Sequence, residues 1–339
     1  MAKGRHRRRK RAWLALLAGV AALPAAAAAA APADRVAGLL TIRAQDARVA
    51  TIGYRLAVAN RAFCSDQAWL AGFAVHDLSQ YGGEDRDAAA RTFGLGGAPA
   101  VLALVEGGPA AAAGLRLDDH LLSIDGADIP RAGGDGHSFD LVEDVLDRLD
   151  AALADGVAEL GIRRQGQPIA IRIEGVRGCP TRFQAVPGRT LQARADGIYV
   201  QVTSGIVAFV ASDDELAALL AHEFAHNVLR HRRRLDDARV SRGLLANFGR
   251  NARLIRATEV EADRLSVHLL DRAGFDVDAG ARFWRRFGPR GIALFDAPTH
   301  PPWRSRVAAL AEEAARIRAA RAAGTPIEPP IGRGPLGAD

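Results

Sequence analysis

The segment HEFAH, from His222 to His226, contains the residues whose types and spacing are best suited to chemistry. Two histidines four positions apart project from the same side of a helix, since each residue adds about 100° of rotation. Neutral imidazole nitrogens suit Zn²⁺, and a catalytic zinc site uses three protein ligands and leaves a position for water. Glu223 lies next to the first histidine and is the candidate general base. The segment therefore predicts a catalytic site with one Zn²⁺ per chain.

A third ligand is expected on the helical segment ATEVEADRLSVHLLDRAGF, where Glu259 and Asp263 share one face. We assign Glu259 to the metal and Asp263 to a hydrogen bond that orients a ligating imidazole. Glu261 lies about 200° from Glu259 and should face elsewhere. On a continuing helix, His231 lies about 140° from His226 and should miss the metal, so we expect it to cap or pack.

The elements that must position these residues can also be read from the chain. Ser212 followed by Glu215 has the spacing of a capping box, which predicts that a helix begins there and continues through HEFAH. The preceding segment YVQVTSGIVAFV is expected to present a strand edge to an extended substrate. Upstream, VATIGYRLAVANRAF shows helical periodicity of apolar residues and predicts a packing helix.

The middle of the chain has a different pattern. Its segments predict a strand, a short helix after GGPA, a turn at Asp125–Gly126, a helix over 138–155 and a hairpin that turns at Gln165–Gly166. The order of these elements, with GGPAAAAGL and LLSIDG, resembles a bacterial PDZ domain. That resemblance implies an extended peptide ligand, with Gly94–Gly97 as a loose match to the carboxylate-binding loop. A spacer domain without a ligand is the alternative.

The strings HEFAHNVLRH, EVEAD and THPPWRSR resemble the M48 zinc peptidases, a family that includes HtpX-like and BepA-like enzymes. In that family the glutamate that begins ExxAD is a zinc ligand, which transfers to Glu259. The resemblance implies a mainly helical zincin-type domain with a small sheet, and an endopeptidase that acts on polypeptides. His300 matches a family position near the active site, where a catalytic role competes with a structural role in the turn before Pro301.

The N-terminus carries the basic excess of the chain. The net charge is +6, but seven cationic residues fall within the first eleven, so the rest of the chain has no basic excess and nucleic-acid binding is not expected. The apolar run that follows, over 12–31, is typical of a secretory signal peptide, with a retained membrane anchor as the alternative. The predicted location is therefore periplasmic or secreted, and membrane contact is expected only if this segment is retained.

The two cysteines, Cys64 and Cys179, flank the middle domain and suit an oxidising compartment, either as a disulfide or as two buried thiols. Together these features predict an α+β protein with a metallopeptidase domain and a PDZ-like domain. A peptide-binding or chaperone-like envelope protein with a latent or structural zinc site is the rival function. The predicted segments are a signal peptide (1–31), a helical segment packing on the peptidase domain (32–93), a PDZ-like domain (94–178), the peptidase domain (179–322) and a disordered tail (323–339).

Overall fold

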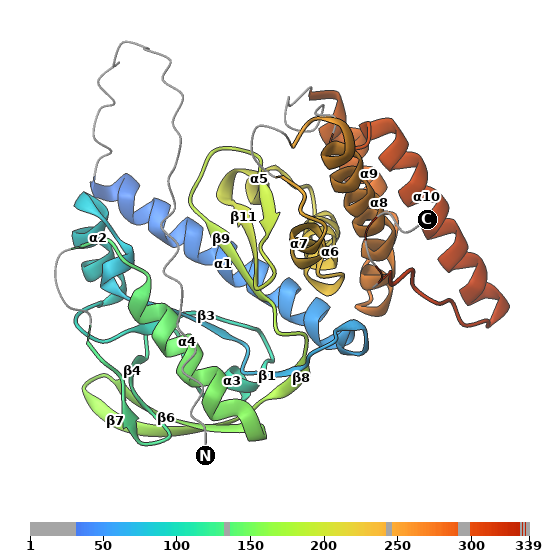
Figure 1. Cartoon of the computed structure of the whole chain (residues 1–339). Helices are drawn as coiled ribbons and strands as arrows, with labels where there is room; N and C mark the ends of the chain where they lie inside the picture. The colour runs from blue at the N-terminus through green and yellow to red at the C-terminus, as the bar shows by residue number, and fades with distance from the viewer. Residues whose placement is uncertain are drawn as a thin grey trace, which may run out of the picture.

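The computed structural model describes residues 32–131, 136–241, 246–290, 299–332, 334 and 336. The predicted signal segment, 1–31, lies outside the described residues. The fold is α+β, as predicted: a helical part surrounds a small sheet, and a middle module has a larger sheet of its own (Figure 1). None of the helices within the described ranges is long and apolar enough to cross a membrane.

The helical part combines the N-terminal helix with the second half of the chain. Its elements are α1 (Pro32–Ala59), β9 (Arg182–Val186), β10 (Ala193–Ala195), β11 (Tyr199–Thr203), α5 (Ser204–Phe209), α6 (Asp213–Val228), α7 (His231–Asp237), α8 (Gly249–Arg272), α9 (Ala279–Phe287) and α10 (Trp303–Ala323), with 3₁₀ turns at Arg61–Phe63 and Gly288–Arg290. Helix α6 is the central element, because α1, α8 and α9 all pack against it.

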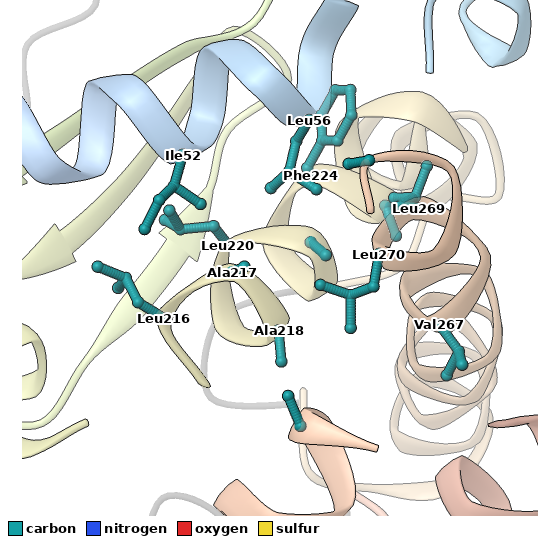
Figure 2. Packing of buried hydrophobic residues seen from close by; sticks show 14 of the residues in the cluster. Ile52, Leu56, Leu216, Ala217, Ala218, Leu220, Phe224, Val267, Leu269 and Leu270 are labelled. Atoms are coloured by element: carbon teal, nitrogen blue, oxygen red, sulfur yellow. The ribbon is translucent and has the colours of Figure 1, made fainter. Parts of the chain in front are cut away.

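The core of the helical part forms where these helices meet. Figure 2 shows side chains from three of them converging, namely Ile52 and Leu56 of α1, Leu220 and Phe224 of α6, and Leu269 and Leu270 of α8. The predicted packing helix in the VATIGYRLAVANRAF segment is thus confirmed by α1. Burial on several sides explains why α6 is apolar around most of its circumference.

The small sheet has the strand order β10-β11-β9, with β11 antiparallel to β10 and parallel to β9. The expectation that the segment over 199–210 offers a free strand edge is wrong, because β11 is the central strand. The edge strands are β10, which contacts α6, and β9, which contacts α1.

The middle module is built on a sheet of order β2-β3-β4-β6-β7, with β5 paired to β4 and helix α4 against the sheet. Its elements are β1 (Ala68–Leu70), β2 (Phe73–His76), α2 (Gly83–Phe93), β3 (Ala100–Leu104), α3 (Pro109–Ala112), β4 (His120–Ile124), β5 (Ala127–Asp128), α4 (Asp140–Ala152), β6 (Val157–Arg164), β7 (Gln167–Glu174) and β8 (Val176–Gly178), with 3₁₀ turns at Leu78–Gln80 and Leu153–Asp155.

The local predictions for this module hold. The hairpin of β6 and β7 turns at Gln165 and Gly166, whose φ angles of 51° and 82° are those a tight two-residue hairpin requires. The sheet nevertheless begins before residue 94, the boundary expected from the sequence, because β2 is its edge strand. The Gly94–Gly97 loop precedes β3, an interior strand, so it does not flank the edge that β2 presents.

A disulfide closes the base of the module. Cys64 and Cys179 are bonded, with their Cα atoms 5.7 Å apart, which resolves the alternative that the sequence left open. Beside the bond, β1 pairs with β8, so the first and last strands of the module are also joined by backbone hydrogen bonds.

The C-terminal residues fold back onto the protein. Pro and Gly content predicted a disordered tail from 323, and some described residues of this segment pack on the helical part. Ile327 and Ile331 pack against the helical core, and Leu336, 8% exposed, joins a cluster with Leu235 and Leu254.

Candidate active site

Helix α6 carries the HEFAH segment, and its first turn is firmly fixed. The Ser212 hydroxyl accepts a hydrogen bond from the Glu215 N–H at 3.2 Å, as the predicted cap requires. The Glu215 carboxylate accepts from the Ala211 N–H and also pairs with Arg286. These hydrogen bonds fix the start of helix α6 and thereby the position of its two histidines.

The three predicted metal ligands lie around one point. The Nε2 atoms of His222 and His226 are 3.3 Å apart. The Glu259 carboxylate of α8 places Oε2 3.4 Å from the first of these nitrogens and Oε1 3.5 Å from the second. One donor atom from each of the three residues lies within 4.8 Å of the others, an arrangement that three ligands of one zinc ion can adopt.

The second nitrogen of His222 faces Asp263. His222 Nδ1 lies 3.0 Å from Asp263 Oδ1. Arg306 of α10, 2% exposed, donates to both oxygens of that carboxylate, from Nε at 2.8 Å and from Nη2 at 2.5 Å, and its guanidinium stacks on Trp284 at 3.8 Å. Sequence reasoning did not single out Arg306. The only signal for it was its position in the THPPWRSR string.

The second nitrogen of His226 has a different partner. His226 Nδ1 lies 2.9 Å from Nδ1 of His231, and His231 Nε2 lies 3.1 Å from Glu261 Oε2. His231 is not among the three clustered ligand residues. Its direct contact with a ligand was not anticipated.

His300 and Glu223 also line the site. His300 Nε2 lies 3.9 Å from Glu259 Oε2, and its Nδ1 lies 3.0 Å from the Thr299 hydroxyl. Burial raises the pKa of Glu223 to about 7, and the nearby Glu259 carboxylate adds to this effect while His222 and Arg306 oppose it.

Charge interactions among the ligands are strong. Burial and Arg306 lower the pKa of His222, but Asp263 and Glu259 outweigh them and raise it to about 9. Burial lowers the pKa of His226 to about 3, so this ring is neutral. Burial tends to raise the pKa of Glu259, but His226 and His222 lower it well below its usual range. The Glu259 carboxylate is therefore ionised, the form that binds a metal ion.

The cluster opens into a cavity of about 310 Å³. Strand β10 forms one wall, helices α6 and α8 hold the polar residues, and Phe283, Trp284 and Phe287 provide an aromatic wall. The cavity thus combines apolar surface with a few convergent polar groups, the usual character of a site that binds and transforms a ligand.

Comparison with known proteins shows that this region is similar to metallopeptidases of family M48. Residues 186–242 and 244–314 match the sequence profile of Peptidase family M48. The chain is 33% identical over 135 residues to the mitochondrial metalloendopeptidase OMA1 of Schizosaccharomyces pombe, covering 33% of this chain and 40% of the relative. It is 29% identical over 168 residues to a putative beta-barrel assembly-enhancing protease of Vibrio cholerae, covering 40% of this chain and 35% of the relative. The chain therefore spans well under half the length of each of these relatives.

Proposed function

We propose that this protein is a zinc-dependent endopeptidase of the cell envelope that hydrolyses exported or misfolded polypeptides. His222, His226 and Glu259 hold the zinc ion, and Glu223 is the general base. The observation that carries the proposal is the cluster of donor atoms from these three residues, which lie within 4.8 Å of one another, in a cavity that Glu223 also lines. The M48 match over the same residues supports the metallopeptidase class.

The roles of the side chains follow from their positions. When bound, the zinc ion supplies Lewis-acid polarisation of the scissile carbonyl and of the attacking water. Glu223 accepts the proton of that water and delivers it to the leaving amine, and a carboxyl group with a pKa raised to about 7 suits both transfers. His300, at the Glu259 side of the cavity, is placed to donate to the oxyanion of the tetrahedral intermediate.

The substrate is expected to bind in an extended conformation along β10. This strand has its unpaired edge at the margin of the small sheet, and its residues line the cavity beside the histidines. An edge strand offers a row of backbone donors and acceptors that bind a peptide without regard to its sequence. Such binding suits an enzyme for misfolded chains, which share a backbone and little else.

The envelope location and the role of the middle module belong to the same proposal. The N-terminal sequence is typical of a secretory signal, and the Cys64–Cys179 disulfide is of a kind that persists in oxidising compartments. The middle module, which resembles a PDZ domain in its element order, is proposed to bind an extended peptide at the edge of β2.

Zinc content and casein hydrolysis test the proposal together. The wild-type protein is expected to hold about one zinc ion per chain and to cleave casein. Glu223→Gln should keep the metal and lose cleavage, whereas Glu259→Ala should lose the metal. Zinc bound without cleavage in the wild type would favour the rival, a peptide-binding or chaperone-like protein with a latent or structural site. A wild-type protein that binds no zinc would exclude the peptidase.

A further inference from the structure

We propose that His231, held by Glu261, is a positioning residue that fixes His226 in the tautomer whose Nε2 binds the metal. The inference rests on the zinc site of the proposed function and adds a second support to it, separate from Asp263. These residues form a relay, in the order His226, His231, Glu261, Arg234.

The direction of the hydrogen bonds follows from the one group in the relay that can only accept. The ionised Glu261 carboxylate has no proton to donate, so His231 must donate to it from Nε2, across 3.1 Å. In a neutral imidazole the other nitrogen, Nδ1, is then an acceptor. It lies 2.9 Å from His226 Nδ1, which must therefore carry a proton. The lone pair of His226 is left on Nε2, the atom that faces Glu259 and His222.

The relay depends on the break between helices α6 and α7. The helix ends at Val228, and Arg230 adopts a left-handed conformation with φ of 53°. That turn starts α7 at His231 and brings its ring back against His226. Only 2% of His231 is exposed, so bulk solvent has little access to either nitrogen. A left-handed arginine costs backbone energy of about 1–2 kcal/mol, which the fold tolerates here.

The far end of the relay is fixed as well. Arg234, one turn further along α7, donates to both oxygens of Glu261, at 2.5 and 3.2 Å. Its Nε donates to the Gly334 carbonyl at 3.0 Å, so the C-terminal segment holds the arginine. A carboxylate with bidentate bonds to a fixed arginine cannot turn away from His231. Packing alone would not require this alignment of donors and acceptors along the relay.

The chain offers a matched control for the test. His268 of α8 donates from Nε2 to the Glu313 carboxylate of α10 at 2.9 Å, and both side chains are buried. This pair has the same chemistry as His231 and Glu261 but is not part of the ligand cluster. Replacement of either histidine by phenylalanine removes a hydrogen bond between a buried histidine and a glutamate, so both changes should lower stability. Only one of them should change the metal site.

The experiment measures zinc affinity by competition with a chromophoric chelator, using the mature protein with Glu223→Gln to prevent self-cleavage. His231→Phe is expected to weaken zinc binding about 10–100-fold, the usual effect of losing a group that orients a ligating histidine. His268→Phe should stay within about twofold of the parent in the same assay. Equal zinc affinity for His231→Phe and the parent would overturn the proposal.

Two further readouts keep the test decisive if His231→Phe does not fold. Glu261→Gln keeps an acceptor oxygen, so it should fold and weaken zinc binding by a smaller factor than His231→Phe. In the zinc-loaded protein with ¹⁵N-labelled histidine, the NMR spectrum should show protons on His226 Nδ1 and His231 Nε2. A His231 ring protonated on Nδ1 alone contradicts the relay. Casein cleavage by the wild type is measured separately. Failure of the peptidase proposal can therefore be distinguished from failure of the relay proposal.

Discussion

Asp46 gives the protein a pH-dependent stability that can be calculated from the structure. Its carboxyl group is 4% exposed on α1 and accepts a hydrogen bond from the Ala185 N–H of β9 at 2.7 Å. Burial raises its pKa from 3.8 to about 7, despite that hydrogen bond. Between these two pH values the folded protein keeps a proton that the unfolded chain releases.

The direction and the size of this change in folding stability with pH follow from proton linkage. Stability falls as pH rises wherever the folded state binds more protons than the unfolded state. The contribution of Asp46 is therefore most favourable below about pH 4, declines by about 1.4 kcal/mol per pH unit, and stays constant above about pH 7. The total loss is about 4 kcal/mol across this window. Asp46→Asn keeps an acceptor oxygen for Ala185 but cannot ionise, so it should escape this loss.

The assay is urea unfolding of the metal-free protein from pH 4 to pH 8, followed by tryptophan fluorescence. The free energy of unfolding of Asp46→Asn, relative to wild type, should rise by about 4 kcal/mol between pH 4 and pH 7. Asp34→Asn changes an exposed aspartate on the same helix and should show no comparable rise. A difference between Asp46→Asn and wild type that stays constant across the whole pH range would refute the reasoning.

Three further changes test other parts of the structure. Asp263→Asn weakens the acceptor that orients His222, and zinc affinity should fall about 10-fold, measured by chelator competition with the metal content of the wild type as reference. Replacing Cys64 and Cys179 by serine removes a disulfide between residues 115 apart in sequence. The free energy of unfolding, measured in urea, should therefore fall by about 4 kcal/mol. Unchanged stability would mean that the bond does not form in the protein. Gly53→Ala would place a methyl group 2.1 Å from an aromatic ring of β9, so the melting temperature should drop by several degrees, whereas Gly38→Ala, with open space around it, should not lower it.

Local pattern already grouped most of the residues that the structure brings together in the candidate site. His222, His226 and Glu223 are spaced along one helix, and Glu259 and Asp263 along another, so helical geometry alone groups each set on one face. The hairpin of β6 and β7 is equally local, because its turn residues accept positive φ angles. For the C-terminal segment, amino-acid composition did not indicate which residues pack on the core. A few apolar residues in a Pro- and Gly-rich segment, Leu336 among them, are enough to hold it against the core.

The sequence by itself determined which residues share a helical face, and thus the identity of the clustered donors. Tertiary structure decided which side chains support these donors from outside the cluster. The angular argument for His231 assumed a continuous helix, but the helix breaks at the left-handed Arg230, and the His231 ring lies against His226. Arg306 reaches Asp263 from 43 positions away, across the contact between α8 and α10. Such contacts depend on how whole helices pack, and no periodicity along the chain records how two helices cross.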